Sequence, residues 1–216
     1  MWPWSEIRLL KSAIRLYAGD HVLSRVMSER EKSLILGAQR SELTVMFVDI
    51  AVIAIPDDAA PLLELQQFVK NYLQTVTDCI ASHGGVLDSY VGDMCITWWK
   101  DASSACRCAA QVVKRMESGN KQNQSGKSPN IKVRIGIDTG VVLLGNYGSS
   151  ERIKYTVFGD TVNLASRLCG MANSEFKVPI VITGATKRAM SDAIQTTALD
   201  IVNVKGKKEP VELFTL

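Results

Sequence analysis

The sequence is poor in the residues that build metal clusters and disulfide frameworks. It contains only two histidines, His21 and His83, and no cysteine stands at a metal-ligand spacing with either of them. Its five cysteines are an odd number, which favours reduced, mostly buried thiols over a set of disulfide bonds. These cysteines are Cys79, Cys95, Cys106, Cys108 and Cys169.

Charge of one sign and long apolar runs are also scarce. The net charge is +3 in 216 residues, whereas a nucleic-acid-binding surface requires Lys and Arg clustered on one face. No zinc-finger spacing or RNA-binding aromatic motif is present. No window reaches the roughly 18 consecutive apolar residues of a transmembrane helix, and residues 1–17 lack the apolar core of a signal peptide. We therefore expect a cytoplasmic protein with no transmembrane segment and no nucleic-acid partner.

The N-terminal segment is predicted to be helical. Apolar residues recur at helical spacing through residues 5–36, with Gly19 interrupting the pattern and Gly37 as a candidate C-cap. Interleaved basic residues would suit a membrane-surface helix, but packing on the rest of the chain or on a second copy is favoured. We expect a helical extension over residues 1–36, followed by one domain over residues 37–216.

The rest of the chain alternates between strand and helix patterns. The expected strands are residues 43–50, 86–91, 94–99, 131–138, 141–146, 152–158, 180–182, 197–204 and 210–215. The expected helices are residues 62–82, 101–117, 160–171 and 184–190, and the polar stretch 117–130 is expected to be a surface loop. Thr139 and Gly140 are expected to join two separate strands. This order predicts an α+β fold with one mostly antiparallel sheet and helices on one face.

Two aspartates stand where buried strands end. Asp49 closes the apolar run of residues 43–50, and Asp93 lies in the tight turn of a hairpin. A carboxylate leaving apolar strands is costly unless a cation pairs with it, and neither aspartate has Arg or Lys close by in sequence. Either one alone would be interpreted as a turn cap. Together they favour a divalent cation, since Mg²⁺ takes one or two carboxylates plus substrate phosphates.

A second polar cluster lies on the predicted helix 160–171. Asn163 and Arg167 are four residues apart and share a helix face, and a guanidinium beside an amide suits a phosphate group. The alternative is a solvated helix face. Residues 204–208, with three lysines, add a positive turn that is weak evidence by itself.

Four blocks of sequence resemble the class III nucleotidyl cyclase catalytic domain. They are "LTVMFVDI", "GGVLDSYVGD", "VRIGIDTGVVLLGNYGSSERIKYTVFGDTVNLASRL" and "NVKGKKEPVELF", and the resemblance covers about residues 41–216. It implies a ferredoxin-like βαββαβ core with extra strands, in a head-to-tail homodimer with composite active sites. It also implies conversion of a nucleoside triphosphate to its 3′,5′-cyclic monophosphate and pyrophosphate, with a separate protein as the downstream effector.

The resemblance also implies roles for individual residues. Asp49 and Asp93 would hold two Mg²⁺ or Mn²⁺ ions, with the Ile50 carbonyl assisting. From the other chain of the dimer, Arg167 would stabilise the transition-state phosphoryl oxygens and Asn163 would orient the ribose. Lys205 would bind the terminal phosphates, and Thr156 occupies the position that contacts the base.

Two departures from the family pattern concern the substrate. After Asp49 the family has Asp-Ile-x-Gly-Phe, whereas this chain has Val52 and Ile53 in place of the Gly and Phe. Purine cyclases place a base-reading Lys or Glu four residues before the second metal aspartate, where this chain has Ser89.

These departures leave several alternatives open. We favour a pyrimidine substrate, as in the bacterial uridylate and cytidylate cyclases of anti-phage defence, with UTP and cyclic UMP ahead of CTP. ATP stays an alternative because bacterial adenylate cyclases often carry Thr at the position of Thr156. A catalytically silent nucleotide-binding or dimerisation module is the alternative from another class.

Overall fold

A computed structural model of the chain describes residues 3–54, 62–122, 130–191, 193–204 and 209–216, without the side chains of residues 52–54, 62–65 and 122. The chain forms two compact units. One consists of residues 1–41 and 143–158, and the other of residues 42–142 and 159–216. No helix in the described ranges combines the length and apolar character needed to cross a membrane.

The first unit contains the N-terminal helices. The predicted break at Gly19 is confirmed, since helix α1 (Trp4–Ala18) ends there and α2 (Asp20–Glu29) begins after it. The helical segment ends earlier than expected, in a short 3₁₀ helix, η1 (Arg30–Leu34). Gly37 is not a helix cap but the first residue of strand β1 (Gly37–Ala54).

Buried polar contacts hold η1 within the first unit. Strand β5 (Ile153–Phe158) pairs antiparallel with the C-terminal part of β4 (Asn130–Gly148). The Asn146 amide on β4 donates two hydrogen bonds of 2.7 Å, to the carbonyls of Ser33 and Ile35. On α2, the Arg25 guanidinium lies over the Tyr155 ring, 4.4 Å from its centroid. These contacts hold the α2–η1 segment against strands β4 and β5.

The strands form one mixed sheet in the order β2-β3-β1-β4-β6-β8-β7, with β5 beside β4. The strands not yet given are β2 (Val86–Val91), β3 (Met94–Trp99), β6 (Ile180–Thr183), β7 (Thr197–Val202) and β8 (Val211–Thr215). The pairing of β4 with β6 is parallel, and β1–β3, β2–β3, β4–β5, β6–β8 and β7–β8 are antiparallel. The predicted α+β fold with a mostly antiparallel sheet is therefore confirmed.

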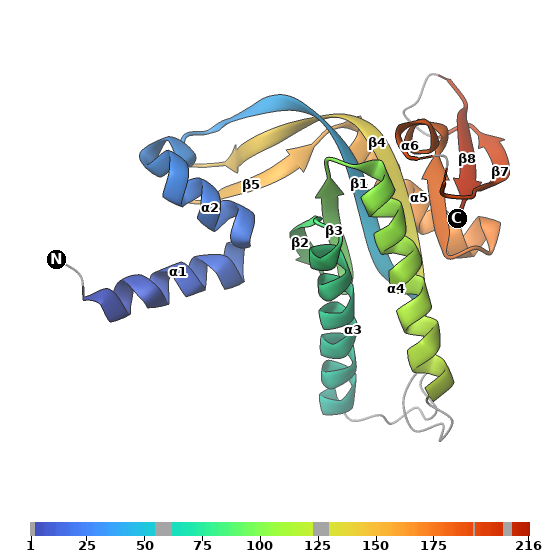
Figure 1. Cartoon of the computed structure of the whole chain (residues 1–216), viewed down its shortest axis with the longest axis horizontal. Helices are drawn as coiled ribbons and strands as arrows, with labels where there is room; N and C mark the ends of the chain where they lie inside the picture. Colours follow the sequence, from blue (N-terminus) through green and yellow to red (C-terminus); the bar gives the residue numbers. More distant parts are fainter. Residues whose placement is uncertain (1–2, 55–61, 123–129, 192, 205–208) are drawn as a thin grey trace. The chain divides into compact units, whose positions relative to one another are not determined.

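Helices cover both faces of the sheet in the second unit, and the expectation of one covered face was wrong. Ile180 and Ile182 on β6 belong to the main core, which α3 (Leu62–Ser82) and α4 (Ala102–Gln122) cover side by side (Figure 1). Val181, between them, packs in a second cluster with residues of α5 (Asp160–Met171). Because successive strand residues point to opposite faces, α5 lies on the other side from α3 and α4.

Strand β4 is continuous where two strands and a turn were predicted. Thr139 is fixed inside the sheet by hydrogen bonds between its hydroxyl and those of Thr44, at 2.9 Å, and Thr186, at 3.1 Å. A Cβ atom at Gly140 would lie 2.7 Å from Oγ1 of Thr161 on α5. Gly140 therefore permits the close approach of a helix and does not mark a turn.

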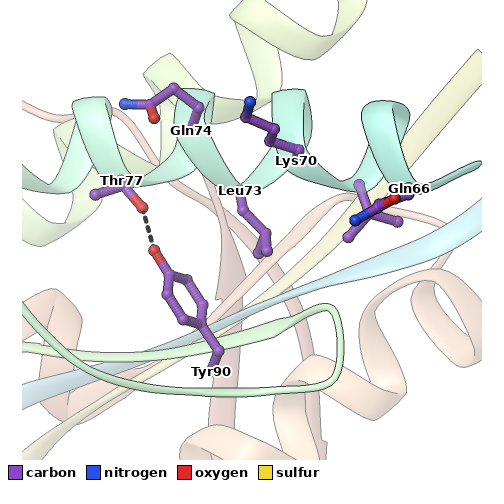
Figure 2. Close-up of a pocket in the computed structure, with 7 residues that line it drawn as sticks. Gln66, Lys70, Leu73, Gln74, Thr77 and Tyr90 are labelled. Carbon is purple, nitrogen blue, oxygen red and sulfur yellow. Dashed lines mark hydrogen bonds between the residues drawn. The ribbon is translucent and has the colours of Figure 1, made fainter. Parts of the chain in front are cut away.

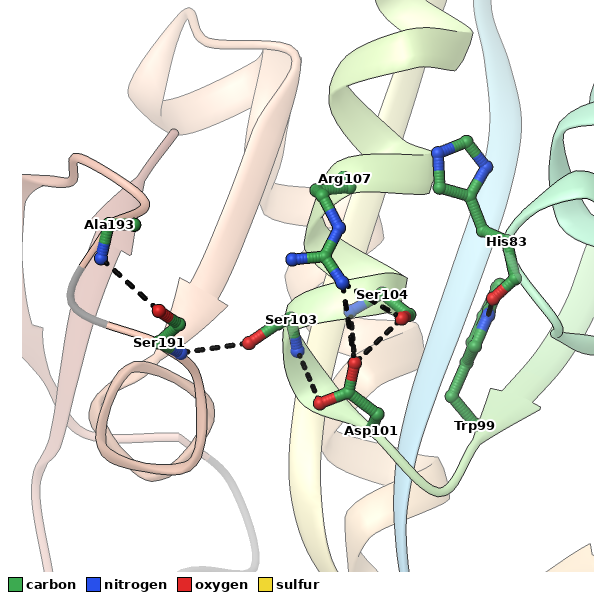
Figure 3. Close-up of polar contacts among 8 residues, drawn as sticks. All are labelled: His83, Trp99, Asp101, Ser103, Ser104, Arg107, Ser191 and Ala193. Carbon is green, nitrogen blue, oxygen red and sulfur yellow. Dashed lines mark hydrogen bonds and ion pairs between the residues drawn. The ribbon is translucent and has the colours of Figure 1, made fainter.

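Helix α4 begins with a side-chain cap and runs five residues beyond its predicted end. The Asp101 carboxylate accepts from the backbone N–H groups of Ser103, at 3.3 Å, and Ser104, at 2.9 Å (Figure 3). The Ser103 hydroxyl accepts from the backbone N–H of Ser191, just after α6 (Gly184–Ala189). The first residues of the expected loop 117–130 are therefore helical, and residues 123–129 lie outside the described ranges.

Candidate active site

Asp49 has a cationic partner that the sequence argument missed. Its carboxylate Oδ2 accepts from Arg134 Nε at 2.9 Å and from Nη2 at 2.5 Å. Arg134 is on β4, which lies beside β1 in the sheet although the two residues are far apart in sequence. Arg134 is 85 residues away from Asp49 along the chain, outside the sequence neighbourhood to which the sequence argument was limited. The available signal was a charged residue inside the apolar run "VRIGI".

Asp49 and Asp93 act on the same buried groups. Burial, followed by the charges of Asp49 and Asp93, raises the pKa of the Cys95 thiol to about 12. Burial also raises the pKa of the Tyr72 hydroxyl, and both aspartates add to that effect. The hydrogen bond from Arg134 to Asp49 raises the pKa of the Arg134 guanidinium, and the charges of both aspartates add to that effect. The charges of the two carboxylates therefore influence the same three groups.

The hairpin that carries Asp93 contains a bulge that determines where Ser89 points. Leu87 pairs with Thr97 and Ser89 pairs with Ile96, so Asp88 is the extra residue between them. Directly paired residues share a face, so Leu87 and Ser89 point to opposite sides of the sheet. Strict alternation along the strand, without the bulge, would have placed Ser89 on the same face as Leu87.

The register places Ser89 on the face that carries Asp49. Ile96, the partner of Ser89, pairs in turn with Phe47 on β1, two residues before Asp49. The intervening Val48 and the following Ile50 point into the core under α3 and α4. The Ser89 hydroxyl donates to Asp88 Oδ2 over 3.0 Å, so its oxygen lone pairs are directed elsewhere.

The adjacent residue Tyr90 points the other way, toward α3. Its hydroxyl and that of Thr77 are 2.7 Å apart (Figure 2). Tyr90, Leu73 and Gln74 line an open groove between α3 and β2. This groove lies on the opposite face from Asp49 and is separate from the candidate site.

Helix α5 divides into a buried and an exposed face, as its sequence predicted. Leu164, Leu168 and Cys169 are buried, whereas Asn163 and Arg167 are exposed. The helix begins after its N-cap residue Gly159, which has a φ of +143° and no side chain to act as a cap. The exposed Asn163–Arg167 pair is available to a ligand or to another chain.

The structure describes the remaining predicted site residues only in part. The Ile50 side chain is apolar and lies in the core, so only its backbone carbonyl could act as a ligand. Thr156 is half-buried on β5 in the first unit, paired with Gly145. Lys205 lies outside the described residues, as do the side chains of Val52 and Ile53.

Comparison with known proteins identifies the family. Residues 37–216 match the family described as "Adenylate and Guanylate cyclase catalytic domain". Adenylate cyclase 1 of Rhizobium meliloti is 30% identical over 82% of this chain, and an adenylate cyclase of Anabaena cylindrica is 31% identical over 98% of it. The chain spans only 28% and 44%, respectively, of the length of these two relatives.

A solved structure agrees with the sequence matches. The crystal structure of the adenylyl cyclase CyaB from P. aeruginosa is 30% identical, with a TM-score of 0.72, and the match covers 83% of this chain and 95% of that one. The family match alone covers well over half of the chain. The chain belongs to the family of class III adenylate and guanylate cyclase catalytic domains.

Proposed function

We propose that this chain catalyses the cyclisation of a nucleoside triphosphate to its 3′,5′-cyclic monophosphate, with release of pyrophosphate. The observation that carries the proposal is that the little-exposed Asp49 carboxylate binds a cationic group, Arg134, on a chain of the cyclase family. A carboxylate that already attracts a guanidinium is suited to bind a harder cation, and Asp93 would supply the second carboxylate.

The donor set fits two Mg²⁺ or Mn²⁺ ions. Two carboxylates and a backbone carbonyl are the hard oxygen ligands that these ions prefer. When bound, the ions would lower the pKa of the ribose 3′-hydroxyl and neutralise charge on the α-phosphate. Asp49 and Asp93 would hold the ions with the Ile50 carbonyl. The limited exposure of the Asp49 side chain, 12%, would strengthen that electrostatic attraction.

The other proposed residues act on the nucleotide. Arg167 would stabilise the phosphoryl oxygens in the transition state, and Asn163 would orient the ribose. Lys205 would bind the terminal phosphates, and Thr156 would contact the base. Following the family resemblance, we place the two aspartates and these four residues on different chains of a homodimer, so that each site needs both copies.

Different observations support two candidates for the base. The two relatives named above are called adenylate cyclases, and Thr156 suits an adenine base, so ATP is the first candidate. Ser89 supports a pyrimidine, because it faces the Asp49 side of the sheet but is too short to reach a purine edge as Lys or Glu would. With UTP as substrate, the product would be cyclic UMP, a signal for a separate effector in antiviral defence.

One assay tests both levels of the proposal. The purified chain is incubated with Mn²⁺ and each of the four nucleoside triphosphates, and the products are identified by mass. Cyclic AMP alone would support the first candidate and exclude the pyrimidine one, and cyclic UMP or cyclic CMP would do the reverse. Absence of any cyclic product would leave the silent module as the better interpretation.

A further inference from the structure

Arg134 occupies one specific oxygen of the Asp49 carboxylate. Both of the hydrogen bonds that it donates to this residue, from Nε and Nη2, end on Oδ2. The Asp49 side chain is 12% exposed and that of Arg134 is 36% exposed, so water screens the pair only in part. Charge-assisted hydrogen bonds of this kind are among the stronger ones in proteins.

A metal ion that binds Asp49 through Oδ2 would need the oxygen that Arg134 holds. A carboxylate offers only two oxygens, so a pair of ions that took one oxygen each would have to displace Arg134 from Oδ2. A guanidinium and a metal cation repel each other and compete for the same lone pairs. We propose that Arg134 is the counterion of Asp49 in the metal-free enzyme and must leave Oδ2 before the full pair of ions can bind. This inference rests on the metal site of the proposed function, and it makes Arg134 a positioning residue that sets the metal affinity.

Arg134 would have to leave as a cation. Its hydrogen bond to Asp49 raises the pKa of a guanidinium that is already always charged in proteins, so loss of a proton is not an available route. The partly exposed side chain can instead rotate into water. Its backbone remains fixed in β4, where its carbonyl accepts a hydrogen bond from the Cys169 thiol over 3.3 Å. The exchange therefore involves one side chain and no change of fold.

Loss of the guanidinium should have opposite effects in the absence and in the presence of metal. Without metal, the Asp49 carboxylate would be left little exposed and without its cation, which destabilises the folded chain. With metal, the ion would no longer need to displace a competitor. We expect Mn²⁺ binding to tighten by about two- to fivefold, the range that corresponds to a partly exposed ion pair.

The test measures Mn²⁺ binding to the nucleotide-free chain, from the electron paramagnetic resonance signal of free Mn²⁺. Thermal unfolding is followed with and without the ion. The Arg134→Ala chain should bind Mn²⁺ more tightly and, without Mn²⁺, should melt at a lower temperature than the unmodified chain. Addition of Mn²⁺ should raise its melting temperature by more. Arg134→Lys keeps a cation and should return the affinity toward that of the unmodified chain.

Arg107→Ala is the matched control. Arg107 also pairs with an aspartate, Asp101, at 3.5 Å, but both side chains are more than half exposed (Figure 3). Its removal should leave Mn²⁺ binding unchanged. If Arg134→Ala fails to fold, Arg134→Gln, which retains a donor to Oδ2 without the charge, should shift the affinity in the same direction.

The outcomes separate this inference from the proposed function. Unchanged or weaker Mn²⁺ binding in the Arg134→Ala chain overturns the counterion role. Tighter binding in a chain that forms no cyclic nucleotide contradicts the proposed function and supports the role of Arg134. Absence of Mn²⁺ binding in both the unmodified and the Arg134→Ala chains contradicts both.

Discussion

Ser89 and Tyr90 are neighbours in β2 whose side chains lie on opposite faces of the sheet. Ser89 shares its face with Asp49, whereas Tyr90 reaches Thr77 on α3 (Figure 2). The bulge at Asp88 produces this arrangement, because the extra residue exchanges the sheet faces on which the following side chains of the strand lie. A strict alternation would have turned Ser89 toward α3, away from the proposed substrate.

The first prediction compares these two neighbours. Ser89→Ala should change the ratio of kcat/KM among the four nucleoside triphosphates, because it alters a polar group on the substrate side. Tyr90→Phe should leave that ratio unchanged but lower the free energy of unfolding by about 1 kcal/mol, since the Thr77 hydrogen bond is lost. Competition assays and denaturant titrations measure the two effects. An equal change of ratio in both variants would remove Ser89 from base selection.

A second prediction concerns the packing of α5 on β4. A Cβ atom at Gly136 would overlap the Ala165 carbonyl oxygen and the Cys169 amide nitrogen. Because both atoms are helix backbone, Gly136→Ala should push α5 outward and lower the free energy of unfolding by about 1–3 kcal/mol. Activity should fall as well, since α5 carries Asn163 and Arg167.

Gly170→Ala is the control for that substitution. Gly170 lies in α5 with open space around its Cβ position, so alanine there should raise the free energy of unfolding by about 0.4–1 kcal/mol. Urea titrations of both variants give the comparison. Equal stability of the two alanine variants would mean that α5 does not need its close approach to Gly136.

The main features of the fold could be predicted from local patterns in the sequence. The hairpin 86–99, the helix ending at Ser82 and the terminal pair β7–β8 each follow from apolar periodicity bounded by turn residues. The error on β4 arose because Thr139–Gly140 resembles a turn locally, whereas contacts with Thr44 and α5 keep the strand continuous. Such contacts form between distant segments and leave no local signal.

The candidate site could likewise be predicted only in part from the sequence. The carboxylates and the α5 pair could be identified from residue type and spacing, supported by the family resemblance. The pairing of Arg134 with Asp49 and the reversed facing of Ser89 could not, because each depends on strand order or register. The first feature sets the electrostatics of Asp49, and the second sets the direction of Ser89. Both residues had already been identified from the sequence.

A third prediction follows from the burial of the thiols. All five cysteines are free and buried, and burial raises the pKa of Cys95, Cys106, Cys108 and Cys169 to about 12. At pH 8 a thiol of that pKa is ionised in only about one molecule in ten thousand, and the thiolate is the reactive form. The native chain should therefore react very slowly with Ellman's reagent, while the chain unfolded in guanidinium should show five reactive thiols. Rapid reaction of the native chain would contradict this burial.

The fourth prediction tests the proposed transition-state role of Arg167. Arg167→Ala should lower kcat by roughly 10²-fold, the usual cost of removing a preorganised charge from a transition state. Its stability should change little, because the side chain is exposed. Arg188→Ala, which removes another exposed arginine of the same unit, paired with Glu212 at 3.3 Å, should keep a normal kcat. Steady-state kinetics with the accepted nucleotide decide, and an unchanged kcat in Arg167→Ala would reject the role.

The final prediction tests the composite active site of the proposed homodimer. Asp93→Asn removes the charge of a proposed metal ligand, and Arg167→Ala removes the proposed transition-state cation, so each variant alone should be nearly inactive. In a mixed dimer, one site would combine both defects and the other would be intact. Random mixing yields half mixed dimers, so activity should return to roughly a quarter of that of the unmodified chain. Two tagged variants, unfolded together and refolded, provide the measurement, with each refolded alone as the control. If the mixture stays inactive while its mixed dimers can be isolated through both tags, the two halves of the site do not come from different chains.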